Sequence, residues 1–323
     1  MSAPAISIIL RCFNEEKHIG RLLSGIQEQT RDDVEIIVVD SGSTDATVAI
    51  ASHYPVKLVS IQPEDFSFGY SLNQGCAVAS GEYLVFASAH VYPVYADWLE
   101  QLLKPFDNPD IALSYGKQRG NELTKYSEHQ IFAKWFPVQS NFTQTHPFCN
   151  NANAAVRRKL WTQFSYDETL SGLEDLDWAK RIIAAGYTIA YAADAEVVHV
   201  HEETPFKIYN RYRREAIALK KIFPEQAFSF WDFVRLTLSN IGSDYYHAWR
   251  DKMLIWNLMD IPRFRLMQFW GTYQGFKQSG QLSSDLKQTF YYPRSLKYPV
   301  PEAETQRQPI DYAKIQYPHE QVY

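Results

Sequence analysis

The stretch from Glu35 to Thr47, EIIVVDSGSTDAT, constrains the fold of this chain more than any other. Its first half is a continuous run of β-branched residues, which is typical of a strand buried on both faces of a parallel sheet. The run ends at Asp40, and Gly42 then allows an unusual φ in the turn that leads into a helix. Because ligands of open α/β sheets bind outside the carboxyl ends of the strands, we expect Asp40 to face a ligand crevice.

Strand and helix patterns alternate through the first part of the chain. Short apolar runs recur at 6–10, 36–39, 56–61 and 83–87, with helical patterns between them. This order predicts a right-handed, mostly parallel sheet with helices on both faces. Beyond residue 115 the alternation loosens. We expect an amide-rich turn at 150–153 that leads into a helix, a helix over 174–185, and two short strands at 188–192 and 196–200.

The remainder of the chain has a helical pattern and then an extended one. We predict a first domain over 1–205, a helical region over 206–290, and an extended tail rich in Pro and polar residues over 291–323. The helical region mixes Lys and Arg with Trp, and such amphipathic helices can lie on an anionic membrane surface. The alternative is that these helices pack on the first domain or on another subunit of a homo-oligomer.

Composition excludes several classes of protein. A chain of 323 residues that is 46% hydrophobic and 21% charged is an ordinary globular protein, and its net charge of −5 gives no support for nucleic acid as a partner. Three widely spaced cysteines, and neither a signal peptide nor a long apolar run, predict a cytoplasmic location. An NAD-type dehydrogenase is disfavoured because no G-x-G-x-x-G follows the first strand.

Four motifs, taken in order, resemble the family 2 inverting glycosyltransferases with the GT-A fold. They are ISIILRCFNEE, VVDSGSTDAT, GEYLVFASAH, and LEDLDWAKRIIAAGYTIAY followed by VVHVH. The likeness covers roughly Ala5 to His201. It implies a Rossmann-like, mostly parallel central sheet flanked by helices, with the C-terminal helices as an extension. It also implies an enzyme that moves a sugar from a nucleotide-sugar donor to a hydroxyl of a saccharide or lipid-linked saccharide, in bacterial surface polysaccharide biosynthesis.

The alternative is a catalytically inactive relative that binds nucleotide sugars or carbohydrate. A lipid-linked acceptor would place the enzyme at the inner face of the cytoplasmic membrane.

The resemblance implies which residues hold the donor. Arg11, Asn14 and Glu15 would line the base and ribose, and Asp40 would contact one of them. Asn14 and Glu15 could instead cap the first helix. Asn73 lies where related enzymes place a polar group on the donor side.

The chain departs from the family pattern at Ser88, Ala89 and His90. The family usually has Asp-x-Asp here, and its acids hold a divalent ion that bridges the donor diphosphate. Ser88 would contact the donor in this chain. His90 could be a metal ligand together with His199 or His201, for Mn or Mg, although imidazole suits Mn or Zn better than Mg. Three alternatives remain. His90 could contact phosphate directly without a metal, or the donor could be a nucleotide monophosphate sugar with less charge to neutralise. His90 could also have a structural role only.

Two adjacent acids open the helix that starts at Glu174. An inverting transfer needs one carboxylate to take the proton of the acceptor hydroxyl, and the family's base maps onto Asp175. Glu174 would then bind an acceptor hydroxyl, although acids are common at helix starts for electrostatic reasons alone. Arg211, in a basic stretch of the chain, would bind a pyrophosphate unless it lies on a solvated helix face.

Overall fold

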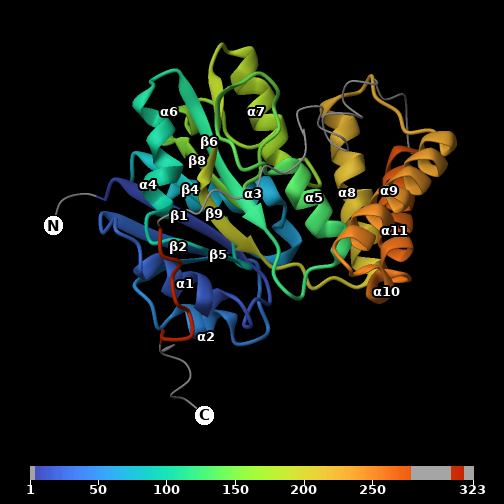
Figure 1. The fold of residues 1–323 in the computed structure, drawn as a ribbon. Coiled ribbons are helices and arrows are strands. Elements are labelled where there is room, and N and C mark those ends of the chain that lie inside the picture. Colours follow the sequence, from blue (N-terminus) through green and yellow to red (C-terminus); the bar gives the residue numbers. More distant parts are fainter. Residues whose placement is uncertain (1–3, 278–306, 316–323) are drawn as a thin grey trace.

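The computed structural model describes residues 4–277 and 307–315. Figure 1 shows an α/β body around a central sheet and, beside it, a body of long helices that begins with α8. The helices predicted for 206–290 are present as far as residue 277, and residues 278–290 lie outside the described residues. Of the extended tail predicted for 291–323, the structure describes only 307–315.

The first half of the sheet is parallel, as predicted. Its strands lie in the order β3-β2-β1-β4 and are β1 (Ile6–Cys12), β2 (Val34–Asp40), β3 (Val56–Ser60) and β4 (Tyr83–Ser88). The register pairs Cys12 with Asp40 and Arg11 with Ser88. The polar residues that end these strands therefore meet at one edge of the sheet.

Helices cover both faces of this parallel half. On one face, Ile6, Ile8 and Leu10 pack with α1 (Ile19–Gln27) and α4 (Trp98–Leu103) in one apolar cluster. On the other face, Ile9 and Phe86 pack with α3 (Phe68–Ala77) and α7 (Glu174–Ala184). Side chains alternate between the faces of a strand, so the Ile and Leu residues of β1 supply both clusters. The short α2 (Thr47–Ala51) follows the turn after β2.

The second half of the sheet is mixed, and here the structure corrects two predictions. Residues 153–157 form a strand, β8 (Asn153–Arg157), which is antiparallel to both β4 and β6 (Ile111–Arg119). The helix predicted to follow the amide-rich turn is reduced to the short α6 (Arg158–Trp161). The two short strands predicted at 188–192 and 196–200 form one strand, β9 (Thr188–His199). A bulge in its pairing with β6 absorbs the polar stretch near Asp194 that suggested a break.

Short antiparallel strands complete the sheet beside β9. They are β5 (Val91–Pro93) and β7 (Asn141–Gln144), and both pair with β9. In β5, Val91 lies opposite His199. The turn between β4 and β5 carries His90, so two predicted site residues are brought together by this pairing.

The helical body contains α8 (Pro205–Ile222), α9 (Phe230–Arg250), α10 (Leu254–Asn257) and α11 (Asp260–Lys277). On α11, Gly271 and Gly275 lie against the backbone of α8 at Tyr209 and Arg213, where a Cβ atom would collide with carbonyl oxygens. Glycine at these positions therefore allows the two helices to approach closely. None of the described helices is both long and apolar enough to cross a membrane.

A buried polar cluster joins the helical body to α5 (Tyr126–Trp135). Arg265 on α11 donates to both carboxylate oxygens of Asp244 on α9, at 2.7 and 2.9 Å. The Ser127 hydroxyl of α5 donates to the same carboxylate at 2.7 Å, and its carbonyl accepts from Arg265. Because Asp244 and Arg265 are almost fully buried, each depends on the other for its charge to be compensated.

The segment 307–315 returns to the α/β body beside β5 (red in Figure 1). Pro309 forms a β-bridge with Tyr95, and the backbone N–H of Ile310 donates to Val94 at 2.9 Å. Arg307 is ion-paired with Asp97 and Asp194. This segment therefore supports the strand that pairs with the end of β9.

Candidate active site

An open cleft of about 750 Å³ lies where the carboxyl ends of β1, β4 and β9 meet the helical body. Most of the predicted site residues line it: Arg11, Asn14, Glu15, Ser88, His90, Glu174, Asp175, His199, His201 and Arg211. The two others, Asp40 and Asn73, do not. The fold therefore brings together residues that are separated by as much as 200 positions in the sequence.

Asp40 holds the turn that follows β2. Its carboxylate accepts hydrogen bonds from the backbone N–H groups of Gly42 and Ser43 at 3.1 to 3.2 Å, and Gly42 has a φ of 89°. Asn14, at the end of β1, joins the two loops: its side-chain oxygen accepts from Thr44 N–H at 2.8 Å. Asp40 thus supports the shape of the loops that border the cleft.

Asn73 lies beneath the cleft, with its amide engaged in the fold. Its Nδ2 donates to the Tyr166 carbonyl at 3.0 Å and to Glu168 at 2.8 Å. Its Oδ1 accepts from the Trp161 indole at 3.0 Å and from Tyr166 N–H at 3.1 Å. Asn73 therefore connects α3 to the loop that precedes α7.

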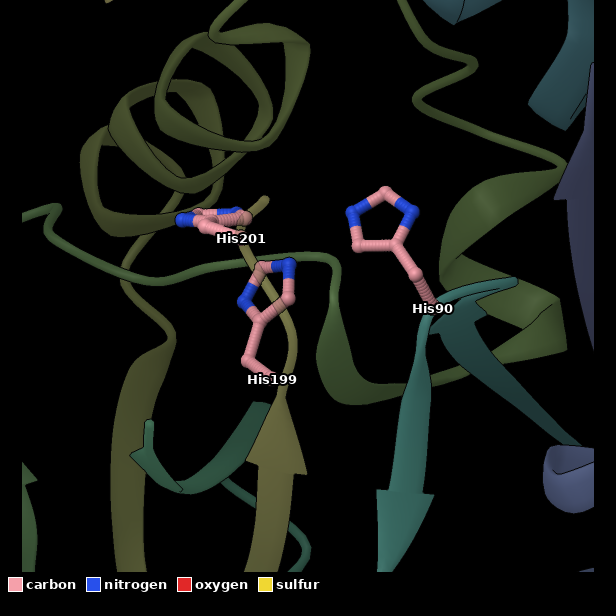
Figure 2. Close-up of side chains that lie close together, drawn as sticks. All are labelled: His90, His199 and His201. Carbon is pink, nitrogen blue, oxygen red and sulfur yellow. The ribbon is translucent and has the colours of Figure 1, made fainter. Parts of the chain in front are cut away.

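Three imidazoles converge on one side of the cleft. Figure 2 shows His90 from the β4–β5 turn facing His199 and His201, which come from the end of β9. One ring nitrogen of each lies within 4.8 Å of those of the other two. The rings of His90 and His199 are stacked with centroids 5.0 Å apart, and those of His199 and His201 are 4.1 Å apart.

Each imidazole is oriented by an oxygen atom at its Nδ1. The distances are 2.7 Å in every case, to Glu15 from His90, to Gln118 from His199, and to Glu128 from His201. When Nδ1–H donates to such an oxygen, the lone pair of the ring lies on Nε2, which is the arrangement that metal-binding histidines adopt.

Among the three imidazoles, His199 is the one whose surroundings most clearly favour a neutral ring with a free Nε2 lone pair. Burial lowers the pKa of this imidazole well below its usual value, and the neighbouring His201 and His90 lower it further. The neutral ring is therefore favoured. Its Nε2 is buried and has no hydrogen-bond partner among the described residues. An unsatisfied buried acceptor is costly, and an ion bound to it would remove that cost.

Arg211 is bound to acids at the edge of this cluster. Its Nη2 lies 2.6 Å from Glu128 and 2.6 Å from Glu203. Burial alone would raise the pKa of the Glu128 carboxyl, but Arg211 and His201 outweigh it and hold that pKa at about 2. Arg211 thus keeps Glu128 ionised as the partner of His201.

Glu174 and Asp175 open α7 on the opposite side of the cleft. Asp175 accepts from the backbone N–H of Asn151 at 3.0 Å and from its neighbour Leu176 at 2.8 Å. Burial, together with the charge of Glu174, raises the pKa of Asp175 to about 7. Glu174 lies 3.4 Å from Arg11 in an ion pair. A carboxylate with a pKa near neutrality is suited to accept a proton.

An aromatic ring between two cations lies at the same end of the cleft. The guanidinium groups of Arg11 and Arg214 lie 4.7 and 4.6 Å from the centre of the Phe68 ring. All three residues line the cleft. The Phe68 ring thus holds the two guanidinium groups near Glu174 and Asp175. Cation–π attraction to the ring offsets part of the repulsion between the two guanidinium groups.

Sequence reasoning missed Phe68, Gln118 and Glu128. Gln118 and Glu128 lie 81 and 73 residues from their histidine partners. Neither belongs to a periodic pattern or to a motif that could have marked it. Phe68 follows Ser67, whose side chain caps α3, so a capping signal marked its position but not its contact with Arg11.

A protein-family model matches roughly the first half of the chain. The model described as "Glycosyl transferase family 2" matches residues 7–164. The O-antigen chain rhamnosyltransferase RfbN of Salmonella typhimurium is 30% identical over 220 residues, which are 64% of this chain and 70% of that protein. The O-antigen chain rhamnosyltransferase WbaN of Salmonella anatum is 29% identical over 221 residues, with 65% and 70% covered.

Solved structures with a similar fold extend over more of the chain. The mannosyltransferase PcManGT from Pyrobaculum calidifontis, in complex with GDP-Man and Mn²⁺, has a TM-score of 0.58 at 19% identity and covers 85% of this chain and 86% of its own. Staphylococcus aureus TarS 1–349 in complex with UDP has a TM-score of 0.51 at 18% identity, with 84% and 91% covered. At such identities the likeness shows the fold alone.

Proposed function

The chain belongs to glycosyl transferase family 2, as its motifs predicted, and from this premise we propose that it transfers a sugar with inversion at the anomeric carbon. The fold is the predicted GT-A fold. The donor is a nucleotide sugar, and the acceptor is a hydroxyl of a saccharide or of a lipid-linked saccharide. One observation supports this chemistry most strongly. The buried carboxyl of Asp175 has a pKa of about 7 and lines the same cleft as the loop after β1.

Asp175 acts as the general base. It takes the proton of the acceptor hydroxyl as that oxygen attacks the anomeric carbon, and the bond to the leaving phosphate breaks on the opposite face of the sugar. Glu174 remains paired with Arg11 and accepts a hydrogen bond from the acceptor. Its negative charge also keeps the pKa of Asp175 close to neutrality, so that the base is both ionised and basic enough at physiological pH.

The sugar is a deoxyhexose of the rhamnose type, and the product belongs to a bacterial surface polysaccharide. The two Salmonella relatives carry the name O-antigen chain rhamnosyltransferase, and each is matched over 70% of its length, which supports this choice. The acceptor that we propose for this assembly is linked to lipid. We therefore place the enzyme in the cytoplasm, at the inner face of the membrane.

A divalent ion fits the three imidazoles. His90, His199 and His201 would hold it, each with Nδ1 already engaged by an oxygen atom, and the buried, unpartnered Nε2 of His199 supports this assignment. Nε2 of His90 lies 3.2 Å from the Ser88 hydroxyl, which would turn aside when the ion binds. In the lining of the cleft, Asp and Glu outnumber Lys and Arg by eight to five, so a donor diphosphate would otherwise meet an excess of negative charge. When bound, the ion would neutralise charge on the leaving diphosphate. Nitrogen ligands favour Mn²⁺ over Mg²⁺.

A donor screen tests the transfer. The full chain is incubated with UDP-, GDP-, dTDP- and CMP-sugars and with saccharide acceptors, and release of the nucleotide is measured. We expect Asp175→Asn to lower kcat by about 10²- to 10⁴-fold, the contribution typical of a general base. Asp177→Asn is the matched control, because Asp177 lies on the same helix but pairs with Arg181. Full activity in Asp175→Asn would remove Asp175 as the base, and no release with any donor would favour the inactive binding relative.

Binding of Mn²⁺ tests the histidine site without reference to activity. Calorimetric titration of Mn²⁺ should show one site in the wild type and a loss of affinity of at least tenfold in His199→Ala. His53→Ala serves as control, because His53 is exposed and lies outside the cleft. Equal Mn²⁺ affinities in all three proteins would contradict the metal assignment and favour direct contact of His90 with phosphate, or a nucleotide monophosphate donor.

A further inference from the structure

The outward face of α9 carries four large, exposed apolar or aromatic side chains, with the exposed Arg235 among them. At about 100° per residue, Trp231, Leu238, Tyr246 and Trp249 fall on the same side of the helix. Their exposed fractions are 77%, 66%, 54% and 66%. The outward side of a helix at the surface of a soluble protein is normally polar, so this face requires an explanation.

The inward face of the same helix is mixed, with Leu236 and Ala248 buried beside three polar residues. Thr237, Asn240 and Asp244 are buried against the rest of the protein, and Asp244 is bound by Arg265 and Ser127. The helix therefore buries polar groups while it leaves large apolar side chains exposed. Large exposed apolar side chains are expected of a helix whose outer side contacts an apolar medium.

The apolar face continues into the end of the helical body. Ile255 and Trp256 on α10 are 86% and 81% exposed, and Met259 is 71% exposed. Figure 1 places α10 at the lower end of the helical body, where it projects beyond α9 and α11. We call the whole face the α9–α10 apolar surface; its residues are Trp231, Leu238, Tyr246, Trp249, Met253, Ile255, Trp256, Leu258 and Met259.

Unpaired positive charge lies within and beside the α9–α10 apolar surface. Among the described residues, Arg250, Lys252 and Arg263 are exposed and have no acidic partner. The acids of the same region are occupied by other groups: Asp232 by Ser229 and Arg235, Asp251 by the Tyr126 hydroxyl, and Asp260 by Lys125. The surface therefore presents exposed aromatic and aliphatic groups together with cations.

We propose that the α9–α10 apolar surface lies in the interfacial layer of an anionic lipid bilayer. Trp and Tyr favour the level of the lipid headgroups, aliphatic side chains reach the acyl boundary, and Arg and Lys bind anionic headgroups. This deepens the proposed function, on which it rests for the lipid-linked acceptor. The helical body docks on the membrane without crossing it.

A second copy of the chain fits this surface less well. Protein interfaces are depleted of Lys at their centre, whereas Lys252 lies between Trp249 and Ile255 in the middle of the apolar stretch. On α10, Ile255 and Trp256 are also exposed almost completely, which suits insertion among lipids.

The docking would bring the cleft close to a lipid-linked acceptor. The α8 helix packs closely against α11 through Gly271 and Gly275 and carries Lys207, Arg211 and Arg214 into the lining of the cleft. The body that contacts the bilayer thus also forms one wall of the site, so a saccharide held at the membrane surface would reach the acids of α7 from this side.

Vesicle flotation of the full chain tests the proposal, and it needs neither donor nor activity. We expect the wild type to float with vesicles of phosphatidylethanolamine and phosphatidylglycerol. Ile255→Ser/Trp256→Ser should lower the partition coefficient at least tenfold, because two strongly exposed apolar side chains are removed from the acyl boundary. Leu58→Ser/Val78→Ser is the matched control, since both side chains are exposed on the α/β body. Arg250→Gln/Lys252→Gln should reduce binding to anionic vesicles and leave binding to phosphatidylcholine unchanged.

Two results would overturn the proposal. One is equal flotation of the wild type and Ile255→Ser/Trp256→Ser. The other is a wild type that does not float. A dimer that these substitutions dissociate, as measured by sedimentation, would then identify a second copy as the occupant. Because the side chains are exposed, unchanged thermal unfolding should confirm that every variant is folded. Failure of flotation with intact sugar transfer would reject the membrane surface and leave the glycosyltransferase function in place.

Discussion

At the scale of single residues, the two adjacent acids of α7 have different tasks because their surroundings differ. Asp175 is buried and accepts hydrogen bonds from two backbone N–H groups, while Glu174 is ion-paired with Arg11. Burial and the neighbouring charge raise the pKa of Asp175 to about 7. The protonation of one residue therefore depends on the charge of the other.

Substitution of Glu174 should shift the pH dependence of the reaction. The base works when it is deprotonated, so kcat/KM should rise with pH through the pKa of Asp175, near 7. In Glu174→Gln the neighbouring negative charge is gone, the pKa of Asp175 falls, and the acidic limb should move to lower pH. The matched control is Asp177→Asn on the same helix. An acidic limb that stays in place or moves to higher pH would contradict the coupling of these two acids.

The residues of the site could be predicted only where a motif marks them. Asp175 and the three histidines follow from the order of four motifs along the chain. Gln118 and Glu128, which orient two of those histidines, lie on elements far away in sequence and carry no local signal. Contacts of this kind depend on how β6 and α5 pack beside the end of β9, and periodicity does not contain that information.

At the scale of elements, the parallel strands were predictable and the antiparallel ones were not. The runs of β1, β2 and β4 are mostly apolar, so burial on both faces can be read from them, whereas the edge strand β3 is largely exposed. In contrast, β8 has the sequence NAAVR, in which Ala and Asn have low strand propensity. The polar residues near Asp194 suggested a break in β9, but the bulge against β6 accommodates them within one strand.

The buried ion pair of α9 and α11 should dominate the stability of the helical body. In Asp244→Ala the Arg265 guanidinium remains buried without its acid, so the free energy of unfolding should fall by about 3 to 5 kcal/mol. The double variant Asp244→Leu/Arg265→Leu removes both charges and should recover most of the loss. Urea unfolding measures both values. A loss below 1 kcal/mol in Asp244→Ala would show that water or another group compensates Arg265.

At the scale of the whole molecule, the last described segment supports the active site from a distance. The Tyr312 hydroxyl donates to the Pro93 carbonyl at 2.5 Å, and its ring packs edge-on against Tyr92. Both partners belong to β5, which pairs with β9 where Val91 lies opposite His199. The carboxyl-terminal segment is thus linked to the histidine cluster through two paired strands.

Removal of this contact should weaken the fold measurably. Tyr312→Ala loses a hydrogen bond and an aromatic contact, and the free energy of unfolding should fall by about 2 kcal/mol. Chemical unfolding of the full chain is the measurement, with Lys314→Ala as control because Lys314 pairs only with Asp311 at the surface. Equal stabilities of the two variants would show that 307–315 contributes little to the α/β body.

The whole molecule combines a family 2 glycosyltransferase fold with a cluster of three histidines, His90, His199 and His201, that we propose as the metal site. Pulsed electron paramagnetic resonance of Mn²⁺ bound to the full chain, with UDP, GDP and dTDP each added in turn, tests this most directly. It detects nitrogen atoms coordinated to the ion. We predict nitrogen couplings from imidazole in the wild type and their reduction in His199→Ala, with His53→Ala unchanged. A bound Mn²⁺ ion with only oxygen ligands, and an identical spectrum in His199→Ala, would contradict the assignment of His90, His199 and His201 as its ligands.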